Sequence, residues 1–405
     1  MGSRLVRIVA AAVGLLVLVT LIGACRILEF DYQPAAFPPG DGALTPAAAQ
    51  VETARILSSQ TITLDDLDMN LAPSTATSAQ LFVDGEAFYP KMLEDLAAAQ
   101  SSIHIDEYGF TPGVVADRFI PVLVDRVNHG VPVRLVVDRV GSRVDTGSRE
   151  MYDRLSQAGV SVVLNDPVVP DVDGPLHLDF DEVGHFYHRK VFVIDGRVAW
   201  VGGAGIEDYF FDGSFHDMFV RIEGPAVAQL QALVMTSYAF HGGQPPADLD
   251  VYFPPSADGT IPTTVVHGVP GTNRSVTDAI HNLIDHAQTR LDIIDPYVAD
   301  SDTLDRIAAA ARRGVQVRFI VPLDSNAPMA QWAFNSHIEN LQAAGVQVLQ
   351  HAVLPHAKVI LADDRVLAGS TNLDAWALYR NWEVSLVFDS PAVADMFERQ
   401  LFAPD

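Results

Sequence analysis

The sequence predicts an α/β protein made of two duplicated units, each with a mixed, largely parallel sheet that helices cover on both faces. Three observations support this prediction. Apolar strand-like runs alternate with amphipathic helix-like stretches from about residue 81 onward, a short pattern of histidine, lysine and aspartate occurs twice, and the two halves can be aligned in the same order. One motif in each half predicts a pseudo-two-fold arrangement with an active site on its axis.

The first unit is expected at residues 81–241. A strand, a crossover helix and a second strand recur along it, which implies parallel pairing. Residues 165–184 are expected to form a loop before the first motif, and this loop carries Asp179, Asp181 and Glu182. The expected elements are a helix at 87–99, a strand at 101–108, a helix at 114–128, a strand at 133–138, a helix at 147–158 and a strand at 160–164.

The second unit is expected at residues 263–405, after a linker at 242–262 that is rich in glycine and proline. It repeats the order of the first unit, which indicates duplication of a whole domain. The expected elements are a helix at 276–288, a strand at 291–295, a helix at 303–313, a strand at 317–321, a helix at 333–344 and a strand at 346–350.

The repeated motif has the form H-x-K-x4-D. Its first copy comprises His188, Lys190 and Asp195, and the residues at 191–194 form an apolar run typical of a buried strand. Because side chains alternate along a strand, the histidine and the lysine point to the same side. The second copy comprises His356, Lys358 and Asp363, and each copy is followed by a short run that begins with glycine, at 202–205 and at 369–372.

Two such copies in one chain resemble the phospholipase D superfamily, whose members bring both motifs together at one phosphodiester site. The stretches at 220–227 and 293–300 are most similar to the bacterial cardiolipin synthase branch, and the resemblance covers roughly residues 80–400. It implies two phospholipase D-like α/β/α domains.

A phosphodiester needs a nucleophile, a proton donor for the leaving oxygen and positive donors for the phosphate charge. The resemblance implies that His188 attacks phosphorus to give a phosphohistidine, while His356 serves as general acid and then as general base. It also implies that acidic residues downstream, Asp217 and Glu383, hold the imidazoles in the required tautomer. The implied phosphate donors are Lys190, Lys358, Ser370 and Asn372.

Three positions depart from the family pattern or lie away from the expected chemistry. Gly205 stands where the family usually has asparagine, which removes one donor from the first half. The motif acids Asp195 and Asp363 lie at the far ends of their strands, where a turn or a structural salt bridge is expected. The sequence contains no cluster of histidines, cysteines or carboxylates with the spacing of a metal site. We therefore expect catalysis without a metal or another cofactor.

Composition bears on the partners. The formal net charge of −25 and pI of about 4.7 disfavour a nucleic-acid substrate because such a chain repels a polyphosphate backbone. The N-terminus places Arg4 and Arg7 before an apolar run at 8–24 and the single cysteine, Cys25, a layout similar to a signal peptide with a bacterial lipobox. The alternatives are an uncleaved membrane anchor and an ordinary cleaved signal. The lipoprotein and the uncleaved anchor both place the body of the protein on the extracytoplasmic side of a membrane. Residues 26–80 are then expected to form a tether, with one possible helix near 47–57.

The sequence therefore predicts a monomeric, membrane-associated phosphatidyltransferase or phospholipase that acts on phospholipids such as phosphatidylglycerol. Transfer to a second lipid is favoured, with hydrolysis in competition. An exported phospholipase D-type hydrolase or nuclease of the same superfamily is the alternative, and a catalytically dead binding protein is a third.

Overall fold

The computed structural model describes residues 35–403 apart from residue 41 and residues 166–184, and Ala35–Asp405 forms one compact unit. The expectations for the N-terminal segment with Cys25, and for the acidic loop residues Asp179, Asp181 and Glu182, lie outside the described residues. In the part of the chain that is described, no helix combines the length and the apolar character needed to cross a bilayer.

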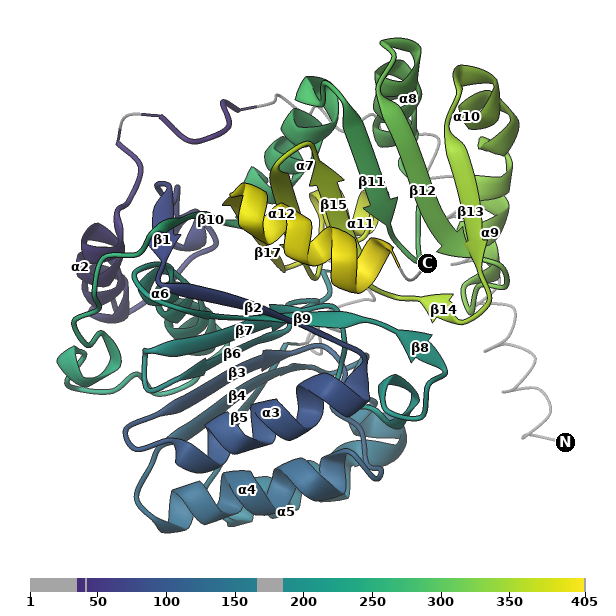
Figure 1. Ribbon diagram of the computed structural model, residues 1–405. Coiled ribbons are helices and arrows are strands. Elements are labelled where there is room, and N and C mark those ends of the chain that lie inside the picture. The colour runs from purple at the N-terminus through teal and green to yellow at the C-terminus, as the bar shows by residue number, and fades with distance from the viewer. Residues whose placement is uncertain (1–34, 41, 166–184, 404–405) are drawn as a thin grey trace, which may run out of the picture. The chain divides into compact units, whose positions relative to one another are not determined.

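The first half of the unit contains a seven-stranded sheet in the order β2-β9-β7-β6-β3-β4-β5 (Figure 1). The helices α3 (Gly85–Ala98), α4 (Ala116–Asn128) and α5 (Arg149–Gln157) bury their apolar residues with one face of this sheet. The strands are β2 (Ser78–Val83), β3 (Ile103–Glu107), β4 (Val133–Asp138), β5 (Ser161–Asn165), β6 (Val191–Ile194), β7 (Val198–Gly202) and β9 (Met218–Glu223).

The second half contains an eight-stranded sheet in the order β1-β10-β17-β16-β15-β11-β12-β13. Apart from the added edge strand β1, it repeats the strand order of the first sheet, as the predicted duplication requires. The strands are β1 (Ser74–Ala76), β10 (Ile261–Gly268), β11 (Arg290–Ile294), β12 (Gln316–Pro322), β13 (Gln347–His351), β15 (Lys358–Ala362), β16 (Arg365–Gly369) and β17 (Glu383–Asp389).

Both sheets are mixed, as predicted, but most of their pairs are antiparallel. Parallel pairing is confined to β3-β4-β5 and to β11-β12-β13, where helices form the crossovers. The motif strands β6 and β15 instead turn back directly into β7 and β16 and pair with them antiparallel. The expectation of largely parallel sheets therefore holds only for the first part of each half.

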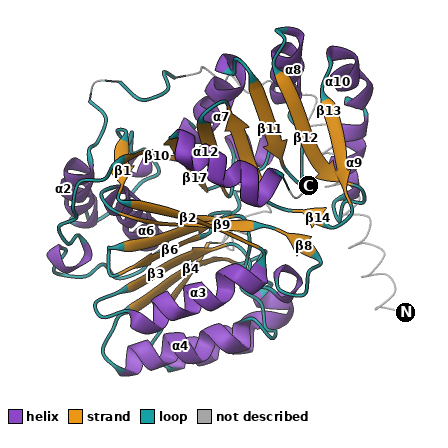
Figure 2. Cartoon of the chain, in the orientation of Figure 1, coloured by secondary structure: helices purple, strands orange, loops and turns teal. Residues whose placement is uncertain are grey.

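The helix predicted at 333–344 is two helices, α9 (Pro328–Asn335) and α10 (Ile338–Ala344). Ser336 Oγ donates to the Ala333 carbonyl at 2.7 Å, and His337 Nδ1 lies 3.1 Å from the same oxygen. These side chains occupy a carbonyl that a continuous helix would use, which ends α9. The remaining helices of the second half are α7 (Ser275–His286), α8 (Ser301–Arg312), α11 (Ala375–Tyr379) and α12 (Pro391–Phe397) (Figure 2).

The two halves share one core. The helix α6 (Ala226–Phe240) is almost entirely buried, and a single apolar cluster joins it to residues of both sheets, among them Val191 of β6 and Val359 of β15. A shared core explains why the halves form one unit rather than two separate domains.

Two segments predicted as connectors belong to this body. The tether expected at 26–80 is wrong for the described part of that range, because α2 (Pro46–Leu57) buries Ala49 and Ile56 in the shared core and β1 pairs with β10. Gln229 of α6 fixes the segment further, since its amide donates to the carbonyls of Leu44 and Ala72. The linker expected at 242–262 likewise places Tyr252 in the shared core.

Candidate active site

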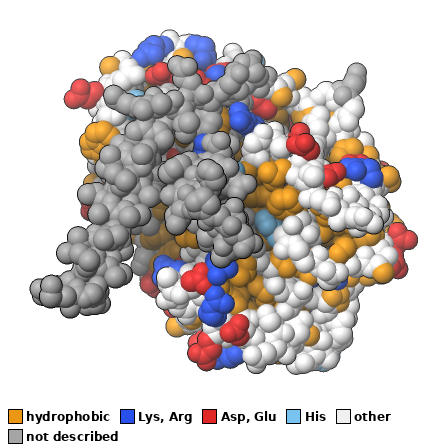
Figure 3. All heavy atoms as spheres, turned by 180° about the vertical axis from the view of Figure 1, so that it is seen from behind, with side chains coloured by type: hydrophobic (Ala, Val, Ile, Leu, Met, Phe, Trp, Pro, Cys, Tyr) orange, Lys and Arg blue, Asp and Glu red, His pale blue; other side chains and the backbone are white. Residues whose placement is uncertain are grey.

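The two motifs occupy matched places in the two sheets. His188 and Lys190 immediately precede β6, while His356 precedes β15 and Lys358 is its first residue. All four side chains are buried or nearly so. On the face seen in Figure 3, hydrophobic side chains gather around a histidine near the middle of the view.

Each half supplies the acid that pairs with the histidine of the other half. His188 Nδ1 lies 3.0 Å from Glu383 Oε1. His356 Nδ1 lies 2.7 Å from Asp217 Oδ2. The sequence identified these four residues but not the exchange of partners between the halves.

Backbone pairing between the halves produces this exchange. The His188 amide donates to the Trp382 carbonyl at 3.0 Å, next to Glu383. The His356 amide donates to the His216 carbonyl at 2.6 Å, next to Asp217, where the short strands β8 (Phe215–His216) and β14 (Leu354–Pro355) run parallel. Each motif histidine is thus hydrogen-bonded through its own backbone to the segment that carries its acid.

The two acids differ in charge. Burial raises the pKa of Glu383 to about 8, although Lys190 and the hydroxyl of Ser370 oppose the rise. Burial also acts to raise the pKa of Asp217, but Lys358 and His356 outweigh it and hold the pKa of Asp217 below its usual value. At neutral pH, Asp217 is therefore ionised while Glu383 holds its proton.

Both imidazoles are neutral in the free site. Burial, followed by Lys358, lowers the pKa of His356 to about 3. Burial and the two lysines lower the pKa of His188 well below its ordinary value. Burial also lowers the pKa of Lys358 to about 8. The site therefore combines two uncharged imidazoles with ammonium groups, which suits an anionic ligand.

Each motif lysine interacts with a buried carboxylate of its own half that the sequence analysis did not select. Burial lowers the pKa of both lysines, and carboxylates oppose it: Glu107 first for Lys190, and Asp217 and then Asp295 for Lys358. Glu107 ends β3 and Asp295 directly follows β11, and they take equivalent places when the two halves are aligned. That equivalence was the signal available in the sequence.

Ser370 and Asn372 differ in their availability to a ligand. The Ser370 hydroxyl donates to Glu383 Oε2, so it supports the acid that pairs with His188. Asn372 is buried, and in the described part of the chain its Oδ1 has no hydrogen-bond partner. Of the two predicted phosphate donors, Ser370 therefore already uses its hydroxyl proton in the bond to Glu383.

Gly205 fits its surroundings only as glycine. A Cβ there would lie 2.6 Å from the Gly109 carbonyl oxygen and 2.9 Å from Glu207 Oε2. Asparagine, the residue that the family usually has at this position, would require both neighbours to move. The Gly205 carbonyl also accepts a hydrogen bond from the Tyr89 hydroxyl at 2.5 Å.

The motif acids lie in turns at the far ends of the strands. Asp195 and Asp363 have positive φ values of 56° and 54°. Asp195 accepts hydrogen bonds from consecutive backbone amides at 100–102, and Asp363 accepts them from the amides at 288–290. These contacts join each motif turn to the segment that leads into the neighbouring strand, β3 or β11.

Aromatic rings surround both histidines. The Tyr108 ring lies 4.9 Å from that of His188. The Tyr297 ring lies 5.8 Å from that of His356. The second histidine also contacts Phe210 and Phe215, and the latter is stacked on it at 5.4 Å. These rings help to bury both imidazoles, and the two histidines are almost equally exposed, at 8% and 7%.

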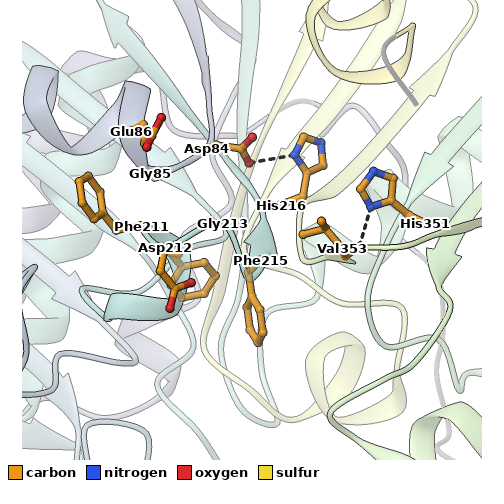
Figure 4. Close-up of a pocket in the computed structure, with 11 residues that line it drawn as sticks. Asp84, Gly85, Glu86, Phe211, Asp212, Gly213, Phe215, His216, His351 and Val353 are labelled. Atoms are coloured by element: carbon orange, nitrogen blue, oxygen red, sulfur yellow. Dashed lines mark hydrogen bonds and ion pairs between the residues drawn. The ribbon is translucent and has the colours of Figure 1, made fainter.

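A cleft of about 410 Å³ lies beside β8, and its lining includes Phe210 and Phe215, the rings that contact His356 (Figure 4). Because side chains alternate, Asp217 points to His356 while His216 lines the cleft. Asp84 accepts hydrogen bonds from His216 Nδ1 at 2.8 Å and from the Asp217 amide at 3.2 Å. The cleft wall therefore supports the Asp217 backbone. Among the described residues, no group of three or more His, Cys, Asp or Glu side chains is placed to hold a metal ion.

The comparisons agree with this geometry. The family model described as "Cardiolipin synthase, PLD-like domain" matches residues 92–235 and 280–403. The cardiolipin synthase of Clostridium perfringens (strain SM101) is 25% identical over 359 residues, which are 84% of this chain and 73% of that protein. Cardiolipin synthase A of Buchnera aphidicola is 29% identical over 314 residues, which are 74% of this chain and 63% of that protein. The chain thus spans about two thirds of the length of these relatives.

A solved structure has a similar fold. The crystal structure of phosphatidylserine synthase from Haemophilus influenzae superposes with a TM-score of 0.61 at 15% identity, covering 88% of this chain and 89% of that one. The family model matches both halves, and each matched interval contains one H-x-K-x4-D motif. The chain therefore belongs to the cardiolipin synthase branch of the phospholipase D superfamily.

Proposed function

We propose that this protein is a phospholipase D-type phosphatidyltransferase that acts on phospholipids such as phosphatidylglycerol. The observation that supports it best is the pair of histidine–acid contacts exchanged between the halves, with a lysine beside each histidine. Two imidazoles supply a nucleophile and a proton donor, and two ammonium groups supply the charge that a phosphodiester needs. The cardiolipin synthase relatives favour a lipid substrate.

In the first step, His188 Nε2 attacks phosphorus and the bond from phosphorus to the head-group oxygen breaks. His356 gives its Nε2 proton to the leaving oxygen. His356 is neutral in the free site, so its Nε2 takes up a proton from solvent as the substrate binds: the phosphate anion offsets the field of Lys358, which had helped to lower the pKa of His356. The product of this step is a phosphatidyl group bound to His188.

In the second step, His356 accepts a proton from the hydroxyl of an acceptor as that oxygen attacks phosphorus. The phosphorus–nitrogen bond breaks and its electron pair returns to His188. A second phosphatidylglycerol as acceptor gives cardiolipin and releases glycerol over the whole cycle, whereas water gives phosphatidic acid. The aromatic rings around His356 favour the lipid acceptor because they limit the access of water.

Lys190, Lys358 and Asn372 are proposed to hold the non-bridging phosphate oxygens. Asp217 and Glu383 hold the imidazoles, and Ser370 acts on the substrate only through Glu383. Asp195 and Asp363 have a structural role in the turns. We also propose that the chain works as a monomer at the extracytoplasmic membrane surface, attached through Cys25.

The test is product analysis with the full chain in phosphatidylglycerol vesicles. Labelled phosphatidylglycerol should yield cardiolipin and free glycerol, and parallel reactions with phosphatidylcholine and plasmid DNA examine the alternatives. His188→Ala and His356→Ala should each lower turnover by at least about 10³-fold with unchanged circular dichroism, because such residues act as a unit. The exposed His129→Ala is the matched control. Phosphatidic acid without cardiolipin at any lipid concentration would exclude transferase activity, and cleavage of DNA alone would establish a nuclease.

A further inference from the structure

Three large apolar side chains that are exposed among the described residues lie beyond the C-terminal ends of parallel strands. Val140 follows β4, Leu323 follows β12, and Trp332 lies on α9 just beyond. The tryptophan is the most exposed of these, at 64%, while Trp200 and Trp382 are buried. A bulky apolar ring left in water is typical of a surface that contacts a partner.

This edge is where the active site lies. Parallel strands end at a common edge, so the loops after β3 and β4 lie together, as do those after β11 and β12. Tyr108 and Tyr297, which follow β3 and β11, contact the two catalytic histidines. The Tyr297 hydroxyl donates to Asn326 Oδ1 at 2.6 Å, which connects the site to the loop between Leu323 and α9.

The charge of this edge differs from that of the molecule as a whole. The chain carries 51 acidic residues and a net charge of −25, whereas residues 325–338, which follow the exposed Asp324, contain no Asp, Glu, Lys or Arg. Residues 139–149 contain three arginines and a single acid, Asp145. Of these arginines, Arg143 has an exposed side chain, which lies 4.0 Å from Glu207 Oε1. An acidic protein that approaches an anionic lipid surface needs an edge of this kind.

We propose that Leu323, Trp332 and Val140 form a docking surface for the interfacial layer of a phospholipid bilayer, with Arg143 facing lipid phosphates. Tryptophan prefers the boundary between head groups and acyl chains, where its ring is partly apolar and its N–H remains hydrated. Docking in this orientation presents the site mouth to the membrane, so a lipid head group reaches the histidines without leaving the bilayer. The inference rests on the proposed function, because it takes a bilayer lipid as the substrate.

The direct test is quenching of tryptophan fluorescence. The full chain is bound to vesicles of phosphatidylglycerol and phosphatidylcholine whose acyl chains carry bromine, and its emission is compared with that in unbrominated vesicles. We expect brominated lipid to quench the wild-type protein, and Trp332→Phe to abolish most of the difference. Equal quenching in the wild type and in Trp332→Phe would overturn the proposal. The proposal would also be overturned if brominated lipid did not quench the protein and the protein formed an oligomer that Trp332→Ser dissociates. This result would place a second copy of the chain on the surface instead of a bilayer.

A turnover assay separates docking from chemistry. Trp332→Ser and Leu323→Ser should each lower turnover of vesicle lipid roughly tenfold, since each removes a side chain that the bilayer buries. Neither should change turnover of short-chain phosphatidylglycerol dispersed as monomers. Val251→Ser, with similar exposure on η4 (Asp250–Tyr252), is the matched control and should change neither rate. An equal loss on both substrates would overturn the docking role.

Failure of the proposed function would be distinct from failure of the docking surface. Quenching that depends on Trp332, without phosphatidyl transfer on any lipid, would preserve the surface and exclude the activity. Transfer on vesicles that is insensitive to Trp332 and Leu323 would preserve the activity and exclude the surface.

Discussion

The two histidine–acid pairs are equivalent in geometry but differ in charge. Lys358 lowers the pKa of Asp217 and so keeps it ionised. Burial raises the pKa of Glu383 to about 8, so this acid stays protonated at neutral pH. The nucleophile needs its lone pair on Nε2, which requires Nδ1–H to face an ionised acid. The imidazole of His188 therefore reaches this tautomer only as Glu383 loses its proton.

This asymmetry predicts a pH profile for kcat/KM. The rate should rise with pH as Glu383 ionises near pH 8, and it should fall above that as Lys358, whose pKa burial lowers to about 8, loses its charge. Ser370→Ala removes a hydroxyl that lowers the pKa of Glu383, so the rising limb should move to higher pH. The test is to measure kcat/KM against pH for Ser370→Ala and for the buried control Ser385→Ala. A shift of the rising limb in both variants, or in neither, would contradict the role given to Ser370.

At the scale of elements, the turns after β6 and β15 depend on their aspartates. Burial acts to raise the pKa of Asp363, but the Thr289 hydroxyl and the backbone amides at 288–290 outweigh it and lower the pKa. A lowered pKa adds stability that is present above about pH 4 and is lost as pH falls further. Asp363→Asn should therefore reduce the free energy of unfolding by about 1–2 kcal/mol at pH 7, and by less near pH 3.5.

Urea denaturation at the two pH values measures this difference. The turnover of folded Asp363→Asn should remain near that of the wild type because the turn lies at the far end of the strand from His356. The neighbouring Asp364→Asn is the control. A variant of Asp363 that is stable but inactive would show that the motif acid takes part in catalysis.

Most elements were predictable because each depends on local pattern. The strand at 133–138 matches β4, and the helix at 114–128 differs from α4 by two residues at its start. The break between α9 and α10 was missed because it depends on two side chains, Ser336 and His337, that occupy a helix carbonyl. The antiparallel pairing of β6 with β7 was missed because the short apolar stretches at 191–194 and 198–202 do not by themselves indicate whether the two strands run parallel or antiparallel.

The candidate site was predictable in its members but not in its pairings. Spacing selected both histidines and both acids, while the exchange of acids between halves depends on backbone pairing of residues far apart in the chain. Glu107 and Asp295 were missed because only a residue-by-residue alignment of the two halves shows their equivalence, and no short motif connects them to the lysines.

At the scale of the whole molecule, the segment at 44–76 holds the two halves together. Ile56 and Leu71 lie in the shared core, and β1 completes the edge of the second sheet. A chain that starts at residue 78 should therefore aggregate or melt well below the full chain, because it loses buried apolar surface worth several kcal/mol. A chain that starts at residue 35 should melt near the full chain. Thermal unfolding and size-exclusion chromatography compare the three, and a stable monomer starting at residue 78 would contradict the packing assigned to this segment.

The central claim is that the two halves form one site in which His188 carries the phosphatidyl group. Rapid acid-free quenching of the reaction with ³²P-labelled phosphatidylglycerol, followed by digestion and mapping of the labelled peptide, tests it most directly. We predict label on His188 in the wild type and none in His188→Ala. In the wild type, the yield of labelled His188 should be higher at pH 8 than at pH 6, because Glu383 is more fully ionised there. Label on His356 alone, or full turnover in His188→Ala, would contradict the account.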